Sequence, residues 1–132
     1  MDLYADIILD LWRNPQNFGE LKNADLQAYE LNPLCGDEVK IQLKLKSNAH
    51  KNMVEKAQFT GNGCAISTAA ASLLTEFVKD KKLSELRRLT DKDIVSLLGI
   101  EIGPQRIKCA ILPLITLKKA LRNFDEKVES SN

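Results

Sequence analysis

The chain has 132 residues, of which 44% are hydrophobic and 28% charged, and its formal net charge is +1. This length fits one domain, residues 1–132, with enough apolar side chains to form a core. The near-balance of charge gives no reason to expect binding to nucleic acid. The first residues lack the basic-then-apolar pattern of a secretory signal, and no apolar run approaches the roughly 20 residues of a membrane span.

The cysteine count also bears on the compartment. Three cysteines, an odd number, do not suit a framework of disulfide bonds in a secreted protein. We therefore expect a reducing setting, the cytoplasm.

The N-terminal segment is predicted to be a helix followed by a loop. From Tyr4 to Arg13 the apolar residues recur at helical spacing, and Asn14-Pro15 ends the pattern, because the residue before proline disfavours the helical conformation. The polar stretch that follows is predicted to be loop as far as Ala24. The apolar stripe of the helix consists of Leu3, Ile7, Ile8, Leu11 and Trp12.

Three strands are predicted next. A short strand spans Leu26 to Leu31, and a clear alternation of aliphatic and polar residues spans Glu38 to Lys46, which is typical of a sheet with one buried and one wet face. The polar turn Ser47–Asn52 holds the only histidine, His50, which we exclude from any site because it lies among turn residues. Val54 to Thr60 is the predicted return strand.

The second half of the chain is predicted to be helical. Ala65 to Lys79 carries a broad apolar stripe, and Leu83 to Leu89 is a shorter helix. Thr90 and Asp93 form the pattern of a capping box at the start of another helix, which Gly99 ends.

The C-terminal part is predicted to contain two helical pieces and a tail. Helical structure begins at Gln105 and carries Cys109, and Pro113 is placed in the first turn of a final helix, where its missing N–H costs little. Residues 126–132 are predicted to be a frayed polar tail. Altogether we expect an α+β fold, a small antiparallel three-stranded sheet packed on one side by helices.

The candidate site rests on the three cysteines. Cys35, Cys64 and Cys109 each lie beside a glycine, a carboxylate or a basic residue rather than inside an apolar run. Thiolates suit zinc, copper(I) and iron–sulfur iron, and Asp37 is the obvious fourth ligand of a tetrahedral site, with Gly36 allowing a tight turn. The alternative is three unrelated buried thiols. A metal site at one end of the sheet is our hypothesis.

Neighbouring residues offer reasons for reactive thiols. Glycines at 61 and 63 permit a sharp turn from strand to helix, which places Cys64 at a helix N-terminus, where thiolate is favoured. Arg106 and Lys108 flank Cys109, and either cation favours its thiolate. Both are equally compatible with ordinary surface charge, and Arg106 with an ion pair to Asp37.

A series of motifs covers nearly the whole chain in one order. These are Asn14-Pro15-Gln16-Asn17-Phe18-Gly19, Asn32-Pro33-Leu34-Cys35-Gly36-Asp37, Ala57-Gln58-Phe59-Thr60-Gly61-Asn62-Gly63-Cys64-Ala65-Ile66-Ser67 and Arg106-Ile107-Lys108-Cys109-Ala110. In that order they resemble the IscU/SufU (NifU N-terminal) family of iron–sulfur cluster assembly proteins.

The resemblance implies a ligand set and partners. Cys35, Cys64 and Cys109 match the family's three thiol positions and Asp37 its aspartate, and together they would hold a transient 2Fe-2S cluster or a zinc ion. A cysteine desulfurase would supply sulfur, with Cys109 as a main acceptor, and apo iron–sulfur proteins would receive the cluster. The resemblance is also compatible with a homodimer that shares one cluster.

Two subtypes remain open, and they decide whether the protein is an enzyme. A scaffold is not an enzyme, whereas a zinc-dependent sulfurtransferase of the SufU type is an enzyme. Lys108 before the third cysteine, where scaffold members have His, favours the SufU type. The short interval from Cys64 to Cys109 favours the scaffold. The scaffold's chaperone-recruiting Leu-Pro-Pro-Val-Lys motif is replaced around residues 102–106. A small structural zinc domain is the third reading; it leaves the weak aspartate ligand unexplained.

Overall fold

The computed structural model describes residues 3–34 and 36–130, without the side chains of residues 3, 4, 48 and 130. The elements follow one another along the chain as α1 (Leu3–Arg13), β1 (Leu26–Leu31), β2 (Glu38–Leu45), the 3-10 turn η1 (Asn48–His50), β3 (Val54–Thr60), α2 (Ala65–Phe77), α3 (Leu83–Arg87), α4 (Asp91–Leu98) and α5 (Pro104–Ser130).

The sheet is antiparallel in the order β1-β2-β3, as predicted. Leu43 of β2 pairs with Leu26 of β1 and Ala57 of β3, so that aliphatic side chains from all three strands share one face. These residues are almost fully buried. The alternation along β2 therefore predicted both the strand and its buried face.

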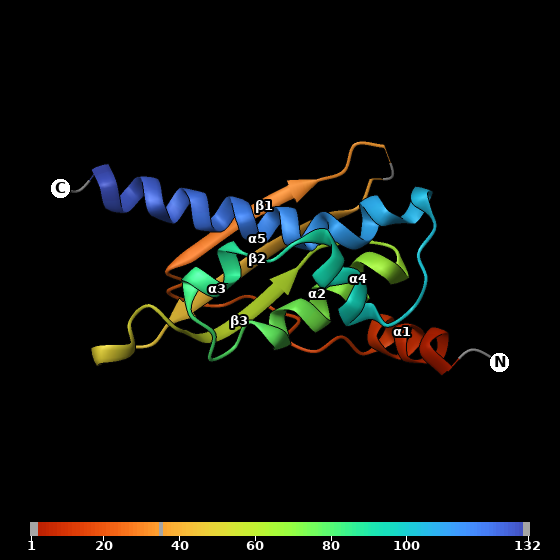
Figure 1. Ribbon diagram of the computed structural model, residues 1–132, viewed down its shortest axis with the longest axis horizontal. Coiled ribbons are helices and arrows are strands. Elements are labelled where there is room, and N and C mark those ends of the chain that lie inside the picture. Colours follow the sequence, from red (N-terminus) through yellow and green to blue (C-terminus); the bar gives the residue numbers. More distant parts are fainter. Residues whose placement is uncertain (1–2, 35, 131–132) are drawn as a thin grey trace.

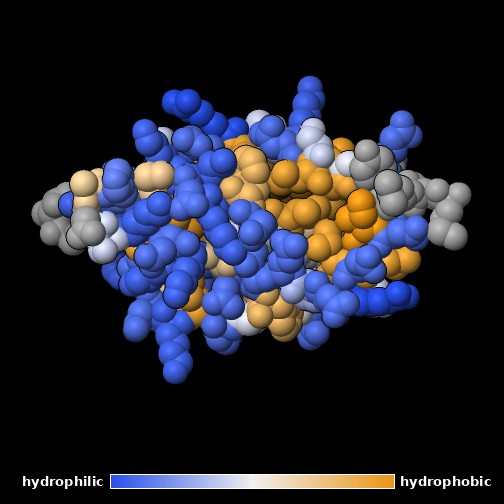
Figure 2. Space-filling model, turned by 90° about the horizontal axis from the view of Figure 1, so that it is seen from below, coloured by the Kyte–Doolittle hydropathy of each residue, from blue (hydrophilic) through white to orange (hydrophobic). Residues whose placement is uncertain are grey.

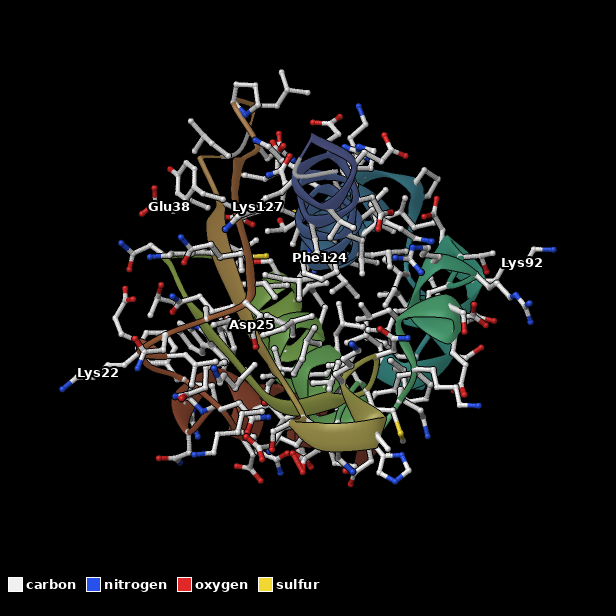
Figure 3. The ribbon with its side chains drawn as sticks, turned by 90° about the vertical axis from the view of Figure 1, so that its left-hand side faces the viewer. Lys22, Asp25, Glu38, Lys92, Phe124 and Lys127 are labelled. Atoms are coloured by element: carbon white, nitrogen blue, oxygen red, sulfur yellow. The ribbon has the colours of Figure 1, made fainter. Side chains whose placement is uncertain are left out.

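Helices cover that apolar face. α2 and α5 contact both the sheet and each other, and α1 packs on α2. Figure 3, which looks at the molecule from the end where the chain terminates, shows Phe124 of α5 pointing inward while Lys22 and Lys92 extend into solvent. The prediction of helices on one side of the sheet is confirmed.

The N-terminal loop crosses the other face of the sheet. Gln42, whose side chain lies on this face and is buried, accepts a hydrogen bond from the Leu21 amide and donates one to the Leu21 carbonyl. Lys40 and Lys44 of the same face pair with Glu20 and Asp25. The lysine row is thus a surface with local ion pairs.

The two ends of the sheet differ in what they carry. The β1–β2 loop, the turn from β3 into α2 and the start of α5 all lie at the end near the chain's N-terminus, whereas η1 and the C-terminus lie at the opposite end (Figure 1). His50 of η1 is exposed at that opposite end, which agrees with its exclusion from the site.

The C-terminal prediction was wrong in two respects. α5 is one helix of 27 residues, with Pro113 in its interior and with residues 126–130 still helical. Pro113 removes one hydrogen bond of the helix, but its ring is buried. Its apolar neighbours pack on the sheet, and their burial stabilises the helix enough for it to continue past Pro113. Rules based on local sequence do not include this packing. These neighbours are Leu112, Leu114, Leu117, Ala120 and Leu121.

The apolar stripe of α1 is only partly buried. Ile8 and Leu11 pack into the core, but Ile7 is 42% exposed and Trp12 47% exposed. The prediction of a helix was correct, but the side of α1 that packs on α2 is narrower than its apolar stripe. No helix in the described part of the chain is both long and apolar enough to cross a membrane.

Candidate metal site

Three of the four predicted ligands meet at the end of the sheet nearest α1. A carboxylate oxygen of Asp37 and the sulfur atoms of Cys64 and Cys109 all lie within 4.8 Å of one another. They come from three segments that are distant along the chain: the β1–β2 loop, the start of α2 and the first turns of α5. The fourth predicted ligand, Cys35, lies outside the described residues.

The Asp37 side chain is held inside the protein and is only partly satisfied. It is 7% exposed, and its Oδ1 accepts a hydrogen bond from the Cys64 amide at 3.2 Å. Its Oδ2 is buried and has no hydrogen-bond partner among the described residues. A buried carboxylate oxygen without a partner is costly, so a cation at this position would relieve the cost.

Hydrogen bonds within the β1–β2 loop place Asp37. The Asn32 amide donates to the Asp37 carbonyl and the Gly36 amide donates to the Asn32 carbonyl, both at 2.8 Å. Gly36 has φ of 77°, a left-handed conformation that glycine adopts without strain. The tight turn expected from Gly36 is present.

Cys64 is the N-cap residue of α2. Its sulfur accepts a hydrogen bond from the Ser67 amide at 3.5 Å, and its side chain is exposed. The preceding turn needs Gly61, whose φ is 137° and whose missing Cβ would lie 2.2 Å from the Glu38 carbonyl oxygen. The predicted strand–turn–helix arrangement around Cys64 is confirmed.

Cys109 lies in the second turn of α5 and is half-buried. It lines an open hollow of about 390 Å³ with Asn32, Leu34, Pro104, Gln105 and Lys108. Leu34 is 80% exposed, so an apolar side chain stands at the edge of the hollow. The hollow gives a partner's atoms a way to the Cys109 sulfur.

The predicted supporting residues behave differently from one another. Arg106 and Lys108 are exposed on α5, and Lys108 lines the hollow beside Cys109. Among the described residues Arg106 and Asp37 do not form an ion pair, so that alternative was wrong; Arg106 is exposed on α5, whereas the Asp37 carboxylate is buried and its Oδ2 has no partner. Gly63 packs against both Ser67 and Asp37, because a Cβ there would lie 2.2 Å from Ser67 Oγ and 3.6 Å from Asp37 Cγ.

Two features of the site were missed from the sequence. One is the contact of Ser67 with the Cys64 sulfur, for which the spacing of three residues at a helix start was a usable signal. The other is a second open hollow of about 350 Å³ beside the Cys64 turn, between Trp12 and Phe18 of the N-terminal segment and residues 61–63. No sequence pattern predicts this hollow.

The chain is similar over most of its length to proteins of a known family. A family model described as the NifU-like N-terminal domain matches residues 3–131. The chain belongs to this family.

Two relatives in the family carry different descriptions. The iron-sulfur cluster assembly scaffold protein IscU of Escherichia coli K12 is 33% identical, over 96% of this chain and 98% of its own. The zinc-dependent sulfurtransferase SufU of Bacillus subtilis is 35% identical, over 90% of this chain and 89% of its own. Both subtypes considered from the sequence are therefore represented among relatives of similar identity.

A solved structure shows the same fold. A SUF-system protein of Fervidobacterium islandicum aligns over 92% of this chain and 96% of its own, with a TM-score of 0.72 and 23% identity. At that identity the likeness concerns the fold alone.

The described ligand atoms fit a soft metal ion. Ligand atoms around one tetrahedral zinc lie about 3.5–3.8 Å apart, so the observed spacing within 4.8 Å needs only a small contraction. Two thiols and a carboxylate leave one position of a tetrahedron to fill. Cys35, two residues before Asp37, is the candidate for it.

Proposed function

We propose that this chain is a scaffold for iron–sulfur cluster assembly, which receives sulfur from a cysteine desulfurase and passes a 2Fe-2S cluster to apo-proteins. Cys35, Asp37, Cys64 and Cys109 would hold the cluster, which is cargo rather than a resident cofactor. The observation that carries the proposal is the gathering of two thiols around a buried carboxylate whose Oδ2 has no partner among the described residues. The similarity to the Escherichia coli scaffold over nearly the full length of both chains supports it.

Sulfur would enter at Cys109. Its thiolate attacks the outer sulfur of a desulfurase persulfide; a new S–S bond forms on Cys109, the old S–S bond breaks, and the desulfurase cysteine leaves as thiolate. The exchange needs no external oxidant, because one persulfide replaces another. The open hollow beside Cys109 gives the donor access, and Lys108 on its wall favours the attacking thiolate.

The surface around the site suits a protein partner. α1 leaves Ile7, Leu9 and Trp12 exposed. Figure 2 shows apolar side chains gathered over one half of the lower face, the half that carries α1, while the other half is mainly hydrophilic. Exposed apolar patches of this kind mark interaction sites. A reducing compartment, the cytoplasm, would keep the thiols ready for this chemistry.

A second candidate is a zinc-dependent sulfurtransferase. Two observations favour it: the basic Lys108 directly before Cys109, and the 35% identity to the Bacillus subtilis sulfurtransferase. The same four side chains would hold zinc, and the ion would keep the thiolates deprotonated until a partner binds. In this case the protein would be an enzyme.

One experiment separates the two candidates. The metal-free protein is incubated anaerobically with iron, cysteine and a cysteine desulfurase, and the visible spectrum is recorded. A cluster that forms and then moves to apo-ferredoxin supports the scaffold, whereas faster desulfurase turnover with zinc bound and no cluster supports the sulfurtransferase. If neither result is obtained, both candidates are wrong.

The carboxylate ligand makes a further prediction. Carboxylate is the weakest of the four ligands toward a soft metal, so a recipient's thiolate displaces it most readily. Asp37→Ala should therefore lengthen the lifetime of the assembled cluster, measured as the decay of its visible absorption in the presence of apo-ferredoxin. An equal or shorter lifetime would contradict a role for Asp37 in release.

A further inference from the structure

We propose that Ser67 is a positioning residue for Cys64, whose hydroxyl group turns to donate a hydrogen bond to the sulfur when Cys64 becomes a thiolate ligand. The inference rests on the proposed function, because it assigns a role within the same metal site. It concerns a residue that is not itself a ligand, and it follows from the contacts at the start of α2.

Ser67 is buried against the Cys64 side chain. It is 5% exposed, and its amide donates to the Cys64 sulfur at 3.5 Å. The Cys64 thiol in turn donates to Ser67 Oγ at 3.7 Å. Both polar groups of Ser67 therefore meet the same sulfur atom.

The Ser67 hydroxyl group can turn to donate to the sulfur without leaving another polar group unpaired. With Cys64 as a thiol, the hydroxyl accepts from the S–H and donates to the Cys64 carbonyl at 3.2 Å. When a metal replaces the thiol proton, the S–H donor is gone, and the hydroxyl can rotate to donate to the sulfur. The Cys64 carbonyl keeps the Thr68 amide as a donor at 3.0 Å.

Gly63 provides the space for this hydroxyl group. A Cβ at position 63 would lie 2.2 Å from Ser67 Oγ, but 3.4 Å from Ser67 Cβ and 3.6 Å from Asp37 Cγ. Since the φ of Gly63 is not in the left-handed range, the glycine is needed here for space and not for backbone conformation. The missing side chain leaves room for the Ser67 oxygen next to the site.

The test uses cobalt(II) alone as the probe, added to the metal-free full chain. Ser67→Ala removes the hydroxyl group, and Thr68→Ala is the matched control, because the Thr68 hydroxyl lies in the same turn but donates to the Gly63 carbonyl. In Ser67→Ala we expect the sulfur-to-cobalt charge-transfer band to move to longer wavelength, because a thiolate with fewer hydrogen bonds is a better electron donor. We also expect cobalt affinity to fall about tenfold, as for other groups that orient metal ligands.

A double variant sharpens the test. Gly63→Ala pushes the hydroxyl group away and should reproduce the shift seen in Ser67→Ala. Combined with Ser67→Ala, it should add nothing further, because its added methyl group no longer meets the oxygen. A helix-capping role alone would lower thermal stability without moving the band. Unchanged band position and affinity in Ser67→Ala, or additive effects in the double variant, would overturn the proposal.

The cobalt and cluster experiments together keep the two proposals distinguishable. If Ser67→Ala moves the cobalt band but the original chain assembles no cluster with iron, cysteine and a desulfurase, the proposed function fails and the role of Ser67 stands. If the original chain assembles and transfers a cluster but Ser67→Ala leaves the cobalt band and affinity unchanged, the proposed function stands and the role of Ser67 is refuted. An original chain that binds no cobalt refutes the role of Ser67.

Discussion

Asp37→Asn should make the metal-free protein more stable, because it removes a buried charge. In the structure Asp37 is 7% exposed, its Oδ1 holds the Cys64 amide and its Oδ2 has no partner among the described residues. Asparagine keeps an oxygen for the Cys64 amide but carries no charge, so most of the cost of the enclosed carboxylate disappears. We expect a gain of about 1 kcal/mol, which corresponds to a rise in melting temperature of about 4 °C for a chain of this size.

The assay is thermal unfolding with and without zinc. Asp10→Asn, which neutralises an exposed carboxylate on α1, serves as control and should change stability by less than about 0.5 kcal/mol. With zinc at about one hundred times the dissociation constant of the original chain, that chain should gain about 2.7 kcal/mol. The Asp37→Asn variant, which lacks the carboxylate ligand, should gain less than about 1.7 kcal/mol, so the order of stability reverses. A metal-free Asp37→Asn protein that is less stable than the original chain by about 1 kcal/mol or more would show that the carboxylate is structural.

Two further predictions concern the turn before Cys64 and the anchoring of the N-terminal loop. Gly61→Ala should cost about 2–4 kcal/mol in urea unfolding, since φ is 137° and the new Cβ would lie 2.2 Å from the Glu38 carbonyl oxygen. Gly103→Ala should leave stability nearly unchanged, because a Cβ at that position would have no atom within 4 Å. Equal urea midpoints for the two variants would refute the reasoning. Lys79 lowers the pKa of Glu76 below its ordinary 4.5. The original chain should therefore be slightly more stable to unfolding than the Glu76→Gln variant above pH 4.5, and this difference should vanish as the pH falls through the lowered pKa. An advantage that persists or grows in acid would contradict this assignment.

The sequence predicted the fold correctly where local patterns and tertiary packing agree. The alternation along β2, the capping box of Thr90 and Asp93, and the glycine at the end of α4 each correspond to a feature of the structure. Pro113 failed as a helix start because burial of its neighbours outweighs one missing hydrogen bond. Tertiary packing of that kind has no local signature.

The sequence indicated which residues could form the candidate site, but not how their side chains are arranged. The order of the motifs around Cys35, Cys64 and Cys109 indicated the family, and the structure brings Asp37, Cys64 and Cys109 together. The sequence could not show that Arg106 stays clear of Asp37. That outcome depends on which face of α5 turns toward the sheet, and the apolar residues further along the helix decide it.

Zinc X-ray absorption spectroscopy of the loaded protein tests most directly whether four side chains share one metal. We predict three sulfur atoms at about 2.3 Å and one oxygen at about 2.0–2.2 Å from a single zinc ion per chain. The third sulfur would come from Cys35. A shell with two or fewer sulfur atoms, or a protein that retains no zinc, would contradict the proposed site.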